Sequence, residues 1–477
     1  MNFFSQPTNK KWQKYLVPLI AVSGICGTTT NANALTFDFS YAPGTTLEQM
    51  IGFETAGQIW SSYLEDDVTV RIHVEMSNTL PENVIGGALP GWQFKQNYTQ
   101  FRQQVFNDRL STDDYTAHES LGISDYDVLL EKRTYRNIDS LSLTNANAKS
   151  LGLITDNPEN LDAYILMSHL TDYSNVSWSY NFDRQQENDH HSLDFLSTAM
   201  HEIGHALGFV SGVDSAKVKD QDATLKENLE RIVKTTSLDL YRYSKNSKKR
   251  QVLDLGVGHQ SYFSLDGGET IIGNFARGKQ ENLQGVDGFQ ASHWKYDNNN
   301  PLGIMTPALK KGETLEITDL DLRAFDVIGW DRSVFNPIDY NQMMQAGKTS
   351  LAQRFDSNAD ASLIDNYLNN IDPIVAVNAA NSLSEDKTNQ VIQMLQQSEI
   401  YEWGSWGGGG NCTGCNNQVL VDDLAQNGIF NQSLYWSTLS TPSVTTASAA
   451  ASTPEPTALF SLVGLGLFVL KSHQKRK

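Results

Sequence analysis

Hydrophobic and polar positions follow two different rhythms in the N-terminal part of the chain. In residues 46–64, apolar residues recur every three or four positions, which predicts an amphipathic helix that Thr45 or Thr46 can cap. In residues 68–76, apolar and polar residues alternate, which predicts a half-buried strand. His73 falls on its polar face beside a Glu and an Arg, so we expect His73 to be a surface residue.

Two further strands are predicted before the next motif. Residues 164–170 are almost continuously apolar, and residues 176–182 alternate between apolar and polar side chains. The second of these is either the edge of a sheet, where an extended substrate could lie, or an inner strand. A helix followed by strands favours an α/β sheet domain. Beyond Asp331, polar helical patterns at 340–355 and 391–400 predict a smaller, separate and mainly helical region, residues 332–403.

A third periodic segment carries the chemistry. Five apolar residues recur at helical spacing and form one stripe: Leu193, Leu196, Met200, Ile203 and Leu207. Ser192 is a candidate N-cap, and Gly208 stands where a helix commonly ends in a left-handed residue. We expect the stripe to pack on the sheet and the opposite face to line a cleft.

The opposite face of this helix carries a metal-binding pattern. His201-Glu202-Ile203-Gly204-His205 places two imidazoles one turn apart, about 6 Å from each other, where they can hold one zinc ion at bonds of about 2.0–2.1 Å. Glu202 can reach a water on that ion and act as a base. The alternative is a chance pentapeptide, but the helical context favours the zinc interpretation.

A catalytic zinc needs a third protein ligand. The extended pattern H-E-x-x-H-x-x-G resembles the metzincin metallopeptidases, but Ser211 stands where most of them have a third His. The leishmanolysin-like branch has a long insertion before a His-Trp pair and then a Met-containing turn. This chain has His293-Trp294 and, further on, Met305 between Gly303 and Pro307. The order and spacing are similar to that branch.

The resemblance implies a fold and a set of roles. The fold is an α/β (α+β) metzincin-like domain over residues 35–331, with a twisted mixed sheet, an active-site helix and a closing helix at 318–330. His293 would be the third zinc ligand, and Met305 an apolar floor below the zinc. By spacing alone, Asp214 and His259 remain alternative third ligands. The four other histidines, His118, His169, His190 and His191, are expected to be solvated or hydrogen-bonded.

The function implied is a secreted or surface-associated zinc metalloendopeptidase. A zinc-bound water, assisted by Glu202, would hydrolyse the peptide bond of a protein or peptide substrate. Two alternatives stay open. One is a non-catalytic extracellular matrix or adhesion protein that keeps zinc for structure; Glu202 argues against it, because structural zinc needs no base. The other is a hydrolase that acts on a non-peptide amide or ester.

Composition narrows the class of protein. The 477 residues carry a formal net charge of −19, which disfavours nucleic-acid binding because phosphate backbones would be repelled. A mean hydropathy of −0.39 argues against a multi-span membrane protein.

Both ends of the chain resemble targeting segments. Residues 1–34 hold three lysines and no acidic residue, then an apolar run and an Ala-Asn-Ala site, as in a secretory signal peptide. Its removal would take the net charge from −19 to −22. Residues 454–477 resemble a PEP-CTERM sorting signal, which implies an exosortase-type partner, a cell-surface or extracellular location and membrane contact only through the two ends. Residues 404–453 are a Gly/Ser/Thr-rich connector, in which we expect Cys412 and Cys415 to form a short disulfide; metal binding and thiol exchange are the alternatives.

Overall fold

The computed structural model describes residues 35–78, 80, 84–130, 132–171, 173, 175–215, 235–279, 284–370, 380–399 and 435–439. The predicted signal peptide, the pair Cys412 and Cys415, and the predicted sorting signal lie outside the described residues, as does the connector apart from 435–439. For residues 435–439 the prediction of a connector is wrong, because they form a strand of the main sheet. Within the described part of the chain, no helix is long and apolar enough to span a bilayer.

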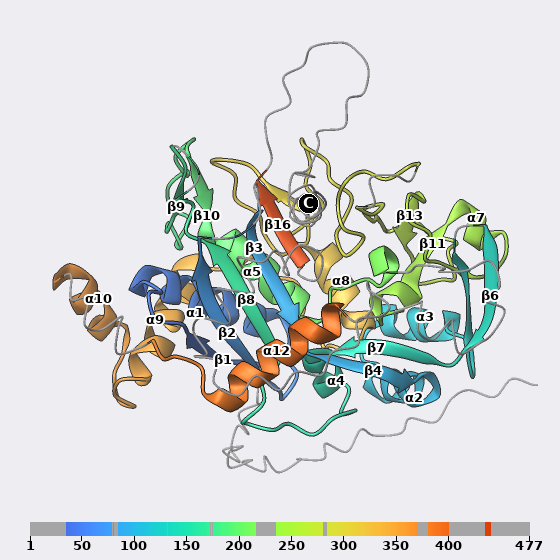
Figure 1. The fold of residues 1–477 in the computed structure, drawn as a ribbon, viewed down its shortest axis with the longest axis horizontal. Helices are drawn as coiled ribbons and strands as arrows, with labels where there is room; N and C mark the ends of the chain where they lie inside the picture. Colours follow the sequence, from blue (N-terminus) through green and yellow to red (C-terminus); the bar gives the residue numbers. More distant parts are fainter. Residues whose placement is uncertain are drawn as a thin grey trace, which may run out of the picture. The chain divides into compact units, whose positions relative to one another are not determined.

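A mixed sheet of six strands carries most of the architecture (Figure 1). The strands lie side by side in the order β1, β2, β8, β3, β16, β15. The first three are parallel, β3 is antiparallel to β8, β16 is antiparallel to β3, and β15 is parallel to β16. Their bounds are β1 Thr36–Tyr41, β2 Thr69–Ser77, β3 Val84–Pro90, β8 Ala163–Ser168, β15 Ala308–Leu309 and β16 Tyr435–Leu439.

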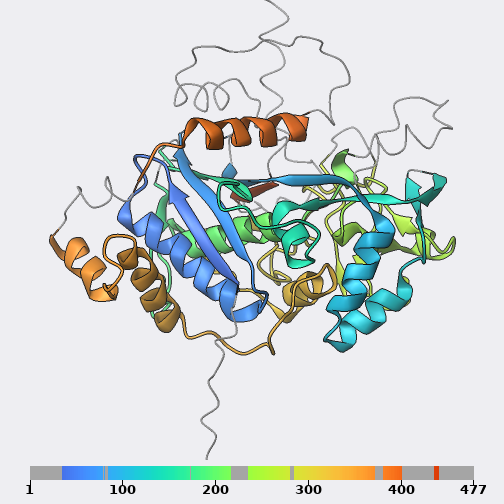
Figure 2. The same ribbon diagram turned by 90° about the horizontal axis from the view of Figure 1, so that it is seen from below.

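Helices cover both faces of this sheet. α1 (Leu47–Tyr63) and α5 (Phe195–Leu207) pack on one face, and α12 (Glu385–Glu399) lies across the other (Figure 2). α1 begins after Thr46, whose side chain forms a capping box with Gln49, as the periodicity predicted. Because both faces are covered, every residue of β3 and β8 is buried, and β2 is buried at most positions.

His73 shows the consequence of that second cover. It lies on β2 as expected, but the expectation of a surface residue is wrong, because only 1% of the residue is exposed. Its Nδ1 lies 2.8 Å from Ser40 Oγ, and its ring stacks on Tyr164. Burial, with a smaller effect of Lys387 from α12, lowers the pKa of His73 to about 3. Alternation along one strand reveals a polar face but not a helix that later covers it.

The segment 176–182 is the second departure. Only β9 (Ser177–Ser179) is a strand, and it pairs in parallel with β10 (Ser192–Asp194) outside the six-stranded sheet. It is therefore neither the edge nor an inner strand of that sheet. Trp178 donates its Nε1–H to Ser168 O at 2.7 Å and packs on Phe195 at the start of α5, which fixes the segment beside the helix.

The helices after residue 332 pack against the sheet domain rather than forming a body of their own. α9 (Tyr340–Gln353) lies along α1, with Gly347 close to the backbone of Thr55. Glu54 of α1 accepts a hydrogen bond from Ser350 at 2.8 Å and pairs with Arg354 at 2.8 Å. α10 (Ala361–Asn370) packs on α9. The region is helical, as predicted, but it is integrated with α1 and the sheet.

The remaining elements lie, in chain order, between β3 and the end of α8. The helices and 3-10 turns are α2 Tyr98–Asp108, α3 Thr112–Ser120, α4 Asn145–Ser150, η1 Val213–Ser215, η2 Leu238–Tyr241, α7 Lys245–Lys248 and α8 Asp319–Val327. The strands are β4 Trp92–Asn97, β5 Tyr126–Leu130, β6 Arg133–Ile138, β7 Ser140–Thr144, β11 Arg242–Ser244, β12 Leu253–Asp254, β13 Ser261–Phe263 and β14 Gly273–Asn274. α8 begins after Thr318 with the capping box that the sequence predicts.

Candidate metal centre

Helix α5 is fixed at both ends by polar groups. Its N-cap is Asp194, which accepts the Ser197 N–H at 2.7 Å, so the expectation of Ser192 as N-cap is wrong. Ser192 lies in β10, and the Asp194 carboxylate also pairs with Arg184 at 3.2 Å. The helix ends at Gly208, whose φ of 125° favours glycine, as predicted.

Two buried tryptophans donate hydrogen bonds to the backbone of α5. Trp60 donates its Nε1–H to Met200 O at 3.0 Å, and Trp330 donates its own to Leu207 O at 2.9 Å. Both indoles are almost fully buried. They tie α5 to α1 and to the end of α8, so the rotation of the helix about its axis is set by long-range contacts as well as by its apolar stripe.

His201, His205 and His293 meet at one point. Their Nε2 atoms lie 3.0 Å apart for His201 and His205, and 3.2 Å apart for each of the two pairs that include His293. All three side chains are buried, with at most 3% of each residue exposed. The structure therefore brings together the three residues that the sequence singles out, although 88 residues separate His205 from His293.

The other nitrogen of each ring is occupied by a backbone carbonyl. His201 Nδ1 lies 2.7 Å from Ile304 O, His205 Nδ1 lies 2.7 Å from Phe209 O, and His293 Nδ1 lies 3.1 Å from Gln290 O. A carbonyl can only accept, so each Nδ1 donates a proton and each Nε2 presents a lone pair to the centre. Burial lowers the pKa of His201 to about 4 and that of His205 well below its ordinary value, so these two rings are neutral.

This arrangement can hold a metal ion. Three lone pairs that face each other at 3.0–3.2 Å repel one another unless a cation lies between them. Two nitrogens bound to one zinc at 2.0–2.1 Å with a tetrahedral angle are about 3.3–3.4 Å apart, close to the observed spacing. Among the residues that the structure describes, this is the group of three or more His, Cys, Asp or Glu residues whose ligand atoms converge in this way.

Glu202 lies beside the triad and against the sheet. It is fully buried, and its Oε1 is so close to Gly86 of β3 that a Cβ at residue 86 would lie 2.9 Å from it. Thr198 of α5 and Met167 of β8 line the same contact. The sequence identifies Glu202 but not Gly86, because the residue that a strand presents to a distant helix depends on how the two elements pack.

Buried polar groups of the long insertion hold the loop with His293. Arg242, with 1% of the residue exposed, donates to Ala291 O at 3.0 Å and to Ala276 O at 2.7 Å. Asp214 accepts the Ala291 N–H at 2.6 Å. These contacts flank the backbone of His293, whose carbonyl accepts the Ala276 N–H at 2.9 Å.

The two alternative third ligands have other roles. Asp214 binds the backbone of the loop, as described above, and is not part of the triad. His259 Nδ1 lies 2.7 Å from Asp254 Oδ1, and this hydrogen bond raises the pKa of His259. Ser211 stands at the sequence position where most metzincins have their third histidine. Its hydroxyl donates a hydrogen bond to Asp239 at 2.6 Å. His293 is therefore the residue that completes the cluster.

Met305 lies against helix α5. A Cβ at Gly204 would be 2.4 Å from Met305 Sδ, so the thioether fills the space that the missing side chain leaves on α5. Met305 is fully buried and bonds to the His293 loop, since its carbonyl accepts the Trp294 N–H at 3.0 Å. This position is compatible with an apolar floor for the cluster.

Asp321 organises this turn, a role that sequence reasoning missed. Oδ1 accepts Trp294 Nε1–H at 2.7 Å, and Oδ2 accepts the Ile304 N–H at 2.9 Å and the Thr318 N–H at 2.8 Å. Burial raises the pKa of Asp321 against the effect of these bonds. The sequence predicts its part in the capping box of α8 but gives no signal for its bond to Trp294.

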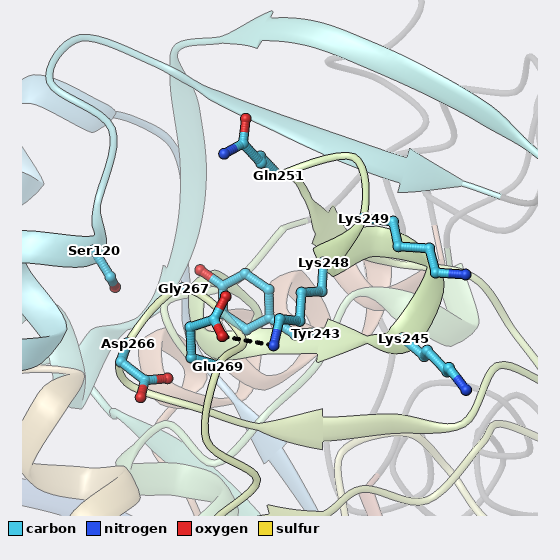
Figure 3. A pocket seen from close by; sticks show the side chains of 9 residues that line it. All are labelled: Ser120, Tyr243, Lys245, Lys248, Lys249, Gln251, Asp266, Gly267 and Glu269. Atoms are coloured by element: carbon cyan, nitrogen blue, oxygen red, sulfur yellow. Dashed lines mark hydrogen bonds and ion pairs between the residues drawn. The ribbon is translucent and has the colours of Figure 1, made fainter.

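A cavity lies elsewhere on the molecule. It has a volume of about 630 Å³ and contains none of the three histidines (Figure 3). The residues that line it are Ser120, Tyr243, Lys245, Lys248, Lys249, Gln251, Asp266, Gly267 and Glu269. Lys248 pairs with Glu269 at 2.7 Å across it. The three histidines, by contrast, are almost fully buried.

Comparison of the chain with family models, with curated proteins and with solved structures finds no match. Inference about its function therefore rests on the geometry of the site and on the motifs of the sequence.

Proposed function

We propose that the protein is a zinc-dependent metalloendopeptidase of the metzincin type, with His201, His205 and His293 as ligands. The observation that supports this best is the convergence of three Nε2 lone pairs with every Nδ1 turned to a carbonyl. Imidazole suits zinc among the common protein metals. The mixed sheet beside α5 agrees with the fold that the resemblance implies. Export and C-terminal sorting stay predictions from the sequence.

The residues would divide the reaction between them. A divalent ion held by three histidines polarises a carbonyl and makes water acidic near neutral pH. Glu202 follows a ligand on the same helix, so its carboxylate would accept the proton of the attacking water and pass it to the leaving amine. The carbonyls of Ile304, Phe209 and Gln290 fix the tautomers of the ligands, which keeps the Nε2 atoms available.

Glu202→Gln tests the proposal most sharply. The amide has nearly the same shape but cannot accept the proton, so metal content should stay and kcat on casein or gelatin should fall by about 10²- to 10⁴-fold. Glu48→Gln, a change at an exposed glutamate of α1, is the matched control and should leave both unchanged. Metal content is measured by elemental analysis of the same samples.

The same assay separates the alternatives. A metal-containing parent chain that digests no peptide, with or without chelator, would instead support a structural zinc in a matrix or adhesion protein. Chelator-sensitive cleavage of amides or esters other than peptides, without peptidase activity, would support the third class.

A further inference from the structure

Strand β16 comes from the far C-terminal part of the chain yet lies in the main sheet, between β3 and β15 (Figure 1). It pairs antiparallel with β3, with Tyr435 across from Ala88, Trp436 from Gly87 and Ser437 from Gly86. On its other side it pairs in parallel with β15, where Thr438 lies across from Ala308. The first four residues of β16 thus pair with β3, and its last two pair with β15.

Both neighbours of β16, the strands β3 and β15, lie close to residues of the candidate site. Gly86 of β3 is the residue that lies against Glu202, and Ser437 is its partner across the ladder. β15 begins three residues after Met305, which packs on Gly204 of α5. β16 also contacts α5 directly. β16 therefore pairs with the edge of β3 that lies next to Glu202, the proposed base.

An external peptide would need the same edge. An extended polypeptide binds a sheet by adding a strand, and its main-chain hydrogen bonds supply affinity whatever its side chains are. The outer edge of β3 can pair with one strand at a time, and here that strand is β16. The burial of all three histidines and of Glu202 agrees with a site that is closed in this arrangement. Because β16 belongs to the same chain, its effective concentration is high, and it competes strongly with a substrate in solution.

We propose that residues 435–439 are a resident competitor, a strand of the chain itself that occupies the place of an extended polypeptide substrate and must leave β3 before one can bind. This inference rests on the proposed peptidase function, because it names the regulation of that same site. It also defines the substrate class, which is a polypeptide in strand conformation antiparallel to β3.

The test removes the pairing of β16 in the full chain. Successive N–H groups of a strand point to opposite sides, so Trp436→Pro with Ser437→Pro removes one donor that faces β3. Thr445→Pro with Thr446→Pro is the matched control, with the same number of prolines outside the strand. The probe is a fluorescently labelled synthetic peptide with the sequence of residues 432–442, and a scrambled peptide of the same composition is its control.

Three readouts follow, and two need no catalysis. Amide hydrogen exchange in residues 84–90 should be faster in the double-proline chain than in the parent or the control. The labelled peptide should bind the double-proline chain at least about fivefold more tightly than the parent, the factor expected for loss of one backbone hydrogen bond from the resident strand. kcat/KM for an unrelated extended peptide should rise by a similar factor.

Failure of this inference is distinguishable from failure of the proposed function. Unchanged exchange in residues 84–90 and equal binding of the labelled peptide by the three chains would overturn the competitor, even if all of them cleave peptides. Faster exchange and tighter binding in metal-loaded chains that cleave no peptide would keep the strand exchange and refute the peptidase. Cleavage of the labelled peptide within its sequence would also overturn the competitor, because the segment would then be a substrate.

Discussion

Helix α5 and the chain segment 291–305 each supply part of the same cluster, but different interactions hold them in place. The helix presents His201 and His205 one turn apart, so their relative position follows from local geometry. The segment with His293 has hardly any regular structure, and buried polar side chains from elsewhere, Arg242 and Asp321, fix its backbone. Half of the centre is therefore local in sequence, and the other half depends on long-range hydrogen bonds of buried charged side chains.

We expect the largest loss of metal affinity from a change at His293, the ligand that lies outside α5. His293→Ala leaves a two-histidine site, so metal affinity should fall by well over 100-fold, more than the loss of an outer partner costs. Metal content after dialysis against a buffered chelator measures this. His259→Ala, in the same insertion, is the matched control and should retain the metal. Loss of metal in His259→Ala but not in His293→Ala would break the assignment of the third ligand.

Asp321→Ala should destabilise the segment that carries His293, because Asp321 binds Trp294 and Ile304 of that segment. The change leaves Trp294 Nε1–H and the Ile304 N–H buried without an acceptor, which should lower the free energy of unfolding by about 3 kcal/mol. Metal affinity should fall as well, because Ile304 carries the carbonyl that orients His201. Asp319→Ala removes a largely exposed carboxylate of the same helix and should cost less than about 1 kcal/mol. Denaturant titration of the metal-free chains measures both, and equal losses would remove Asp321 from its role.

Gly204→Ala probes the contact between the halves. The new Cβ would lie 2.4 Å from Met305 Sδ, so overpacking should cost about 1–2 kcal/mol despite the better helix propensity of alanine. A double-mutant cycle with Met305→Ala checks the cause. If the Sδ contact is responsible, the double variant should lose less stability than the sum of the two single variants. Strict additivity would show that the halves do not meet at this point.

Asp66→Asn should change stability while leaving both halves of the centre intact. Burial, with a smaller effect of Asp331, raises the pKa of Asp66 to about 8. The folded chain therefore prefers the protonated acid, and this contribution to stability is present below the unfolded pKa of about 3.9 and is lost as the pH rises to about 8. At pH 8 the variant should be clearly more stable than the parent, because asparagine carries no buried charge, and at pH 4 the difference should be small. Asp67→Asn, at an exposed neighbour, serves as the control in thermal unfolding at both pH values. A gain that does not depend on pH would contradict the assignment.

The same contrast explains which features could be read from the sequence. The helical segments α1 and α5, the glycine at the end of α5 and the capping box of α8 follow from local patterns, and the structure has all of them. The exposed polar face expected of α1 and the cleft-lining face expected of α5 are wrong, because most residues of α1 and every residue of α5 are buried. The meeting of His293 with the helical pair was predicted only through the resemblance to a family. Its physical basis, the bonds from Arg242 and Asp321, involves residues whose types alone carry no signal.

The wrong predictions share a cause. His73 was expected at the surface because one strand alone does not reveal that α12 covers its polar face. Residues 176–182 alternate like a strand of the main sheet, yet β3 takes the place next to α5. Ser192 is a good capping residue, but Asp194 fits the geometry because Arg184 is available to pair with it. In each case a partner far along the chain decides the outcome.

The central claim is that three imidazoles bind one transition-metal ion through Nε2. Anomalous X-ray diffraction at the zinc edge from crystals of the zinc-loaded chain tests it directly. The account predicts one strong peak about 2.0–2.1 Å from Nε2 of His201, His205 and His293. A zinc-loaded crystal without a peak at these residues, or with the ion bound by other side chains, would contradict it.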